Sequence, residues 1–125
     1  MTERLRVLNL ADLHQKFDAP WSPKRIGRVD NYEVKLAKGE GEFAWHAHED
    51  EDELFFITQG VLRIDFEDRE PVRLHAGEMT IIPKGVRHRP FVEDGPVHIL
   101  LFEKAGVVNT GDAEAGDLTQ QIEDI

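Results

Sequence analysis

The sequence contains no cysteine in its 125 residues. Disulfide bonds, thiolate metal sites and cysteine nucleophiles are therefore excluded. Basic residues are scarce relative to acidic ones, with 15 Lys and Arg against 25 Asp and Glu and a formal net charge of −10 at pH 7. Such a surface repels phosphate backbones, so we expect no nucleic-acid partner. A small neutral ligand, or an anion held through a buried metal, is compatible with this charge.

Long hydrophobic runs are missing as well. No segment approaches the roughly 18 apolar residues that a membrane helix needs, so no membrane association is predicted. The first ten residues, MTERLRVLNL, carry an acid and two arginines and no long apolar stretch. This is not the pattern of a secretory signal, and we expect a cytoplasmic protein.

The composition that remains, 40% apolar and 32% charged, is typical of a soluble globular domain with one core. From residue 29 onward, short segments rich in β-branched and aromatic residues alternate with turn signals such as LysGlyGluGly and ProLysGly. This pattern predicts an all-β sandwich or barrel. The expected strands are 29–37, 42–47, 54–58, 61–66, 72–74, 79–82, 88–92 and 97–102.

The chain is expected to have three parts. Residues 1–29 form an N-terminal helix, capped by Asn9, and an extended arm that contains Pro20 and Pro23. Residues 30–105 form the barrel. Residues 106–125, which are small and polar, form a C-terminal tail that is either a loop or a loosely held helix.

The expected strand 54–58 is apolar on both faces. In a half-buried strand such as 61–66, apolar and polar residues alternate, whereas Leu54, Phe55, Phe56 and Ile57 are all apolar. A strand buried on both sides needs a second cover. The N-terminal arm or a partner subunit provides it, and we expect a homodimer.

Two histidines, His46 and His48, lie one residue apart. On a helix they would point about 200° apart, but on a strand they lie on one face, roughly 6–7 Å apart. In extended backbone one metal ion can therefore meet both. The alternative is a polar turn without a ligand.

Acidic residues follow these histidines. We expect Glu49 to Asp52 to form a solvated turn, whereas Glu53 opens the next strand and can return to the face of the two histidines. A further histidine, His88, comes three residues after the turn Pro83-Lys84-Gly85. By itself His88 has two interpretations, a surface residue or a third imidazole that the barrel folds over the first two.

Together these residues resemble the two motifs of the cupin superfamily. Gly41, His46, His48, Glu53 and Gly60 match the first motif, and Gly77, Pro83, Gly85 and His88 match the second. The resemblance covers about residues 30–103 and is closest to small single-domain cupins described as sugar-phosphate-isomerase-like. TrpSerPro near the start and ValAsnThrGlyAsp near the end agree with it.

The chain departs from the motifs at two places. Four residues separate Gly41 from His46, where the family usually has five, and Val92 stands where the second motif often has asparagine. Neither position carries a metal ligand in the family.

The resemblance implies a double-stranded β-helix, a jelly-roll barrel. It also implies one divalent transition metal, such as Fe, Mn, Ni, Zn, Co or Cu, held by His46, His48, Glu53 and His88. Four protein ligands leave open coordination positions, which favours a metal-dependent enzyme acting on a small molecule, a dioxygenase or isomerase. The alternative function is a non-catalytic module that binds a small molecule or a metal.

The other histidines are not expected to be ligands. His14 is placed on a surface helix and His75 at a strand end, and His98 is interpreted as a core histidine on a face with Leu100 and Phe102. Arg87 flanks His88 and is expected to point away from the metal, at a barrel mouth where it could meet an anion.

Overall fold

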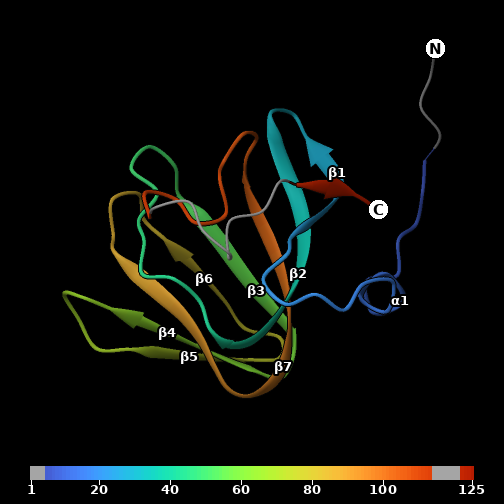
Figure 1. Ribbon diagram of the computed structural model, residues 1–125. Coiled ribbons are helices and arrows are strands. Elements are labelled where there is room, and N and C mark those ends of the chain that lie inside the picture. The colour runs from blue at the N-terminus through green and yellow to red at the C-terminus, as the bar shows by residue number, and fades with distance from the viewer. Residues whose placement is uncertain (1–4, 114–121) are drawn as a thin grey trace.

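The computed structural model describes residues 5–113 and 122–125. Eight strands and one short helix lie within these residues (Figure 1). They are α1 (Leu10–His14), β1 (Lys24–Val29), β2 (Tyr32–Glu42), β3 (Glu53–Gln59), β4 (Val61–Phe66), β5 (Val72–His75), β6 (Met79–Ile82), β7 (His88–Lys104) and β8 (Glu123–Asp124). The all-β prediction is confirmed, and β4 and β6 have the predicted bounds. None of the helices in the described residues is long and apolar enough to cross a membrane.

The long strand β7 joins the two layers of the barrel. Its second half pairs with β2 on one side and β3 on the other, and β3 also pairs with β6. Its first half pairs with β4, which pairs in turn with β5. Figure 1 shows β7 running beside β2 and β3 and then bending away toward β4 and β5. This arrangement is the predicted double-stranded β-helix.

The structure corrects two of the predicted strands. The segments 88–92 and 97–102 are one 17-residue strand, because Glu93-Asp94-Gly95-Pro96 bends the exposed chain without reversing it. The segment 42–47 is not a regular strand. Beyond Glu42 it is extended backbone, with an isolated bridge between His46 and His88.

Two apolar clusters lie on opposite faces of the sheet that contains β2, β3 and β7. Inside the barrel, the residues that pack together include Ile57, Leu62, Ile64 and Ile99, each 0–1% exposed. On the outer face, Leu13 and Phe17 from the N-terminal part pack against Leu36. The N-terminal part thus covers the outer face at β2, and among the residues that the structure describes, those that pack with it do not include the strand 54–58, for which the cover was predicted.

The helix α1 begins at the predicted cap. The Oδ1 atom of Asn9 accepts a hydrogen bond from the amide of Asp12 at 2.9 Å. The prediction that His14 lies on a surface helix is wrong, because its side chain points into the sheet and is completely buried. The ring nitrogens of His14 lie 3.0 Å from the carbonyl of Leu10 and 3.2 Å from that of Ala37.

The C-terminal end of the described chain pairs with β1 beside the barrel. Residues 24–29, within the predicted arm, form β1 and pair with β2. The short strand β8 pairs in parallel with β1, with Glu123 opposite Lys24 and Asp124 opposite Arg25. Residues 114–121, which belong to the tail predicted as a loop or helix, lie outside the described residues.

Candidate metal centre

The backbone places His46 opposite His88. The amide of His46 donates to the carbonyl of His88 at 2.9 Å, and the amide of His88 donates to the carbonyl of His46 at 2.8 Å. The amide of Gly85 donates to the carbonyl of His48 at 2.8 Å, which ties the Pro83-Lys84-Gly85 turn to the same segment. The structure therefore brings together the two sequence blocks that carry the histidines.

Glu53 completes a buried group of four side chains. It is the first residue of β3, and its side chain points inward toward the three imidazoles. Each of the four residues can offer a ligand atom, and those atoms all lie within 4.8 Å of one another. The Oε1 atom of Glu53 is 3.4 Å from Nε2 of His48 and 3.8 Å from Nε2 of His88.

The polar atoms of this group fit a metal ion. Nε2 of His48, Nε2 of His88 and Oε1 of Glu53 are buried and have no hydrogen-bond partner. A buried polar atom without a partner costs about 1–3 kcal/mol. A divalent cation would satisfy all three atoms at once, and nitrogen and oxygen donors of this kind suit a transition metal.

The remaining ring nitrogens orient two of the imidazoles. Nδ1 of His46 lies 2.8 Å from the carbonyl of Ala44, and Nδ1 of His88 lies 2.9 Å from the carbonyl of Val86. A proton on each Nδ1 leaves Nε2 free to bind a metal. Each acceptor is the backbone carbonyl two residues before the histidine. The sequence did not reveal these acceptors, because any residue type can provide a backbone carbonyl.

Burial and neighbouring charges shift the pKa values of His46, His48 and Glu53. Burial, followed by repulsion from His88, lowers the pKa of His46 to about 4. Burial also opposes the charged form of His48, but the nearby Glu53 carboxylate, whose Oε1 lies 3.4 Å from Nε2 of His48, outweighs it and raises the pKa of His48. Burial opposes the anionic form of Glu53 too, yet its contacts with Glu103, His48 and His88 hold the pKa of Glu53 well below the usual range.

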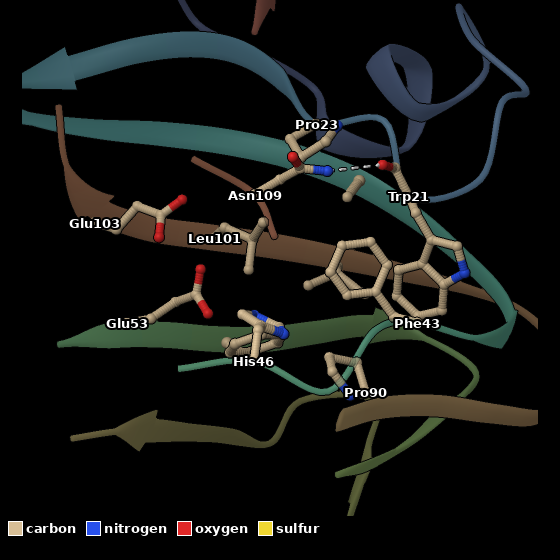
Figure 2. A pocket seen from close by; sticks show the side chains of 12 residues that line it. Trp21, Pro23, Phe43, His46, Glu53, Pro90, Leu101, Glu103 and Asn109 are labelled. Atoms are coloured by element: carbon tan, nitrogen blue, oxygen red, sulfur yellow. Dashed lines mark hydrogen bonds between the residues drawn. The ribbon is translucent and has the colours of Figure 1, made fainter. Parts of the chain in front are cut away.

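A cavity opens inside the barrel beside this group. It holds about 420 Å³ of empty space, its open mouth included. Figure 2 shows the carboxyl groups of Glu53 and Glu103 at one end of the cavity and aromatic rings at the other. The lining residues are Trp21, Pro23, Ala37, Phe43, His46, Glu53, Phe55, Pro90, Ile99, Leu101, Glu103 and Asn109. Most of the wall is apolar, and the carboxyl groups of Glu53 and Glu103 lie at the end of the cavity nearest His46.

The two segments that accompany the barrel motifs in sequence both reach this cavity. Trp21 comes from TrpSerPro and Asn109 from ValAsnThrGlyAsp, and the side chain of Asn109 donates to the carbonyl of Trp21 at 3.5 Å (Figure 2). Asp112 exchanges two hydrogen bonds with the backbone of Ala47, at 2.7 and 3.0 Å. This part of the predicted tail is therefore docked against the histidine segment.

Sequence reasoning missed Glu103. Its carboxyl group lines the cavity and is 3% exposed. Burial and the nearby charge of Glu53 raise the pKa of Glu103 well above its usual range. The alternation Val97, Ile99, Leu101 places position 103 on the inward face, so an acid at that position was a detectable signal.

The surroundings of the other candidate residues are mostly as expected. Glu49, Asp50 and Asp52 are exposed, as predicted for a solvated turn, and His75 is exposed at the end of β5. Arg87 pairs with Glu67 at 3.0 Å, away from the cavity.

His98 differs from its prediction as a core histidine. The inward face of β7 carries Ile99 and Leu101, so His98 faces outward, half-buried beneath α1. There its ring stacks on that of His14, with centroids 4.3 Å apart.

Comparison with protein families gives one match that covers most of the barrel. The family model of the cupin domain matches residues 32–103. Among solved structures, a cupin-2 domain containing protein from Shewanella frigidimarina is 43% identical, with a TM-score of 0.75. That similarity covers 78% of this chain and 94% of the other chain.

Two curated relatives are similar over part of their length. An uncharacterized protein of Bacillus subtilis, YdbB, is 47% identical over 64 residues, which are 51% of this chain and 57% of the relative. An acireductone dioxygenase of Yarrowia lipolytica is 36% identical over 72 residues, 54% of this chain and 39% of the relative. The chain thus spans about half the length of these relatives.

Proposed function

The chain belongs to the cupin domain family, and from this premise we propose that it is a metal-dependent enzyme that acts on a small molecule. The proposed ligands of the metal are His46, His48, Glu53 and His88, which form the buried cluster described above. The observation that carries the proposal is that unpartnered ligand atoms of this cluster meet at the polar end of an otherwise apolar cavity.

The proposed metal is a divalent transition ion. When bound, such an ion can polarise a carbonyl group, lower the pKa of a water molecule or activate dioxygen. Three imidazoles and one carboxylate suit Fe, Mn, Ni, Zn, Co or Cu better than Mg or Ca.

The walls of the cavity indicate the kind of substrate. Trp21 and Phe43 pack with ring centroids 5.1 Å apart, and Phe55 continues the apolar wall toward the metal centre. These side chains exclude water and favour a small molecule with a largely apolar body. Glu53 and Glu103 lie at the other end, so the polar group of that molecule would face the metal.

Oxygenase chemistry is the first candidate reaction and isomerisation is the second. The similarity to a relative named acireductone dioxygenase supports the first, although it covers 39% of that protein. The non-catalytic binding module is the alternative function. Glu103 favours turnover over binding alone, because it gives the cavity a carboxyl group that is not one of the proposed metal ligands.

The test is dioxygen consumption by the full-length protein loaded with Fe²⁺ or Mn²⁺. Small hydroquinones and enediols are offered in turn, with His88→Ala as the inactive control and His75→Ala as the matched variant of an exposed histidine. We expect consumption by the wild type and by His75→Ala only. The binding module is supported instead if some of these compounds raise the melting temperature of the protein but neither the compounds nor dioxygen are consumed.

We also propose that the protein forms a homodimer through the outer face of β3 and β6. Two apolar rows cross this face: Ile81, Leu54 and Phe102 in one, and Met79, Phe56 and Leu100 in the other. Met79 is 48% exposed and Ile81 is 52% exposed. A two-fold axis would bring the same rows of a second copy into contact, and a self-complementary patch of this kind is what such symmetry requires.

A further inference from the structure

A line of buried charged side chains runs across the neighbouring strands β2 and β7 to the proposed metal centre. Glu33 and Lys35 on β2 and Glu103 on β7 are all 3% exposed or less. Glu103 is the register partner of Glu33 on one neighbouring strand and of Glu53 on the other. The position of β7 between β2 and β3 therefore places Glu103 between the buried charges and a proposed metal ligand.

Lys35 fixes one oxygen of the Glu103 carboxyl group. Nζ of Lys35 lies 3.0 Å from Oε1 of Glu103 and 3.6 Å from Oε1 of Glu33. Arg25 pairs with the second oxygen of Glu33. Burying an ammonium group is costly unless it is paired, so Lys35 is held between these two carboxyl groups, and Glu103 with it.

The other side of Glu103 faces Glu53. Figure 2 shows the carboxyl groups of Glu53 and Glu103 turned toward each other at one end of the cavity, and burial together with the charge of Glu53 raises the pKa of Glu103. Oε2 of Glu103 is buried and accepts no hydrogen bond from any donor. Two carboxyl groups can share a hydrogen bond only when one of them carries a proton, and a metal ligand must keep its lone pairs free. This geometry suits Glu103 as the donor and Glu53 as the acceptor.

We propose that Glu103, anchored by Lys35, is a positioning residue that holds the carboxylate of Glu53 in its metal-binding orientation. This inference rests on the proposed metal centre. One oxygen of Glu53, Oε1, faces His48 and His88, and the contact with Glu103 stops the carboxylate from rotating away from them. A hydrogen bond of this kind to a ligating carboxylate typically changes metal affinity by about 10- to 100-fold.

Glutamine and leucine at position 103 separate positioning from simple filling of space. The amide of Glu103→Gln can donate to Glu53 and accept from Lys35, as a protonated carboxyl group does. Leucine has a similar size but offers neither contact. We expect the metal-free Gln variant to bind Co²⁺ with the affinity and visible absorption spectrum of the wild type. The Leu variant is expected to bind about 10- to 100-fold more weakly and with a changed spectrum.

Three results would overturn the assignment. A Leu variant that matches the wild type in Co²⁺ affinity and spectrum shows that Glu103 does not act on Glu53. A folded Gln variant as weak as the Leu variant shows that the two hydrogen bonds are not what matters, and the Gln variant decides the question even if the Leu variant fails to fold. A Glu33→Gln variant that weakens Co²⁺ binding as much as Glu103→Leu assigns the effect to the buried charges as a group.

The experiment also separates this inference from the proposed function. If wild-type protein binds no Co²⁺, or if His88→Ala binds it equally well, the proposed metal centre itself is wrong. If the predicted Co²⁺ results hold while no substrate is consumed, Glu103 remains the positioning residue and only the proposed enzymatic activity fails.

Discussion

Gly111 lies against the proposed metal centre at a point where no side chain fits. Its φ is +53°, a left-handed conformation, and an added Cβ atom would collide with the carbonyl oxygen of Ala47 and lie 2.9 Å from Cδ2 of His46. The backbone of the docked C-terminal segment thus lies directly against the histidine segment. This contact couples the position of His46 to residues that are remote from it in sequence.

Gly111→Ala is expected to destabilise the protein more than Gly106→Ala does. Gly106 has a φ of +89° and open space around it, so both variants share the left-handed strain of about 1–2 kcal/mol, and the collision adds to it only at Gly111. Urea unfolding of the metal-free proteins measures the difference. Metal affinity is expected to fall for Gly111→Ala alone, and equal behaviour of the two variants would contradict this account.

At the scale of residues, the sequence predicted which four side chains come together but not how they are held. The spacing of His46 and His48 indicated extended backbone, and Glu53 followed from the strand that it opens. The carbonyl acceptors of the imidazoles come from local backbone geometry, which residue identities do not determine. Glu103 was missed because the even-numbered residues of its strand, Leu100 and Phe102, are apolar too and were interpreted as the core-facing set.

Among the elements, α1 is held to the barrel by an unusual contact. His14 is buried against β2 and its ring stacks on His98. Burial lowers the pKa of His14, although the carbonyl groups of Leu10 and Ala37 partly oppose this effect, and Lys38 adds to the lowering. Burial, together with the charges of His14 and Lys38, also lowers the pKa of His98. The folded protein therefore favours neutral His14.

The stability that neutral His14 contributes depends on pH in a defined direction. In the unfolded chain His14 binds protons with a pKa near 6.5 and in the folded chain only at lower pH, so the contribution is present above about pH 6.5 and lost as pH falls toward the folded pKa. We expect His14→Phe to lose less stability than the wild type between about pH 7.5 and about pH 5.5.

Urea unfolding in the presence of a chelator measures this difference, and the exposed His75→Gln variant is the control. His75→Gln is expected to follow the wild type at both pH values. A His14→Phe variant whose stability falls as steeply as that of the wild type would show that His14 does not titrate with unfolding.

The elements themselves were predicted well where apolar alternation and turn signals agree. β4 lies between Gly60 and a turn that ends at Pro71, β6 lies between turns that contain Gly77 and Gly85, and the bounds of both strands matched. The break predicted between 92 and 97 is wrong because Glu93 to Pro96 were interpreted as a turn signal, while the strand continues through them into the other layer. Local composition shows that a chain bends, but hydrogen bonding to β2 and β4 determines whether the strand ends or continues after the bend.

On the scale of the whole molecule, the uncovered outer face is the feature that calls for a partner. α1 and Phe17 cover Leu36 and Leu100, whereas Met79 and Ile81 on β6 are about half exposed. Tyr32 stacks on Phe102 at 5.3 Å and extends the apolar surface. The sequence indicated the need for a second cover from Leu54 and Phe56, but only the strand register shows which residues continue the face.

Ile81→Glu is expected to shift the proposed homodimer to monomers, because it would bury a charge in each copy of the interface. Sedimentation velocity measures the distribution, with Val72→Glu on β5 as the control, since Val72 is 38% exposed but lies outside the two apolar rows. A wild-type protein that is monomeric at high concentration would contradict the proposed dimer.

The central claim is that His46, His48, Glu53 and His88 bind one divalent transition metal. The most direct measurement is the metal content of protein purified without chelators, determined by elemental analysis together with the protein concentration. The account predicts about one ion per chain in the wild type and in His75→Ala, in keeping with a single four-ligand site, and almost none in His88→Ala. Metal-free wild-type protein that takes up no transition metal, or a His88→Ala variant with a full complement, would contradict it.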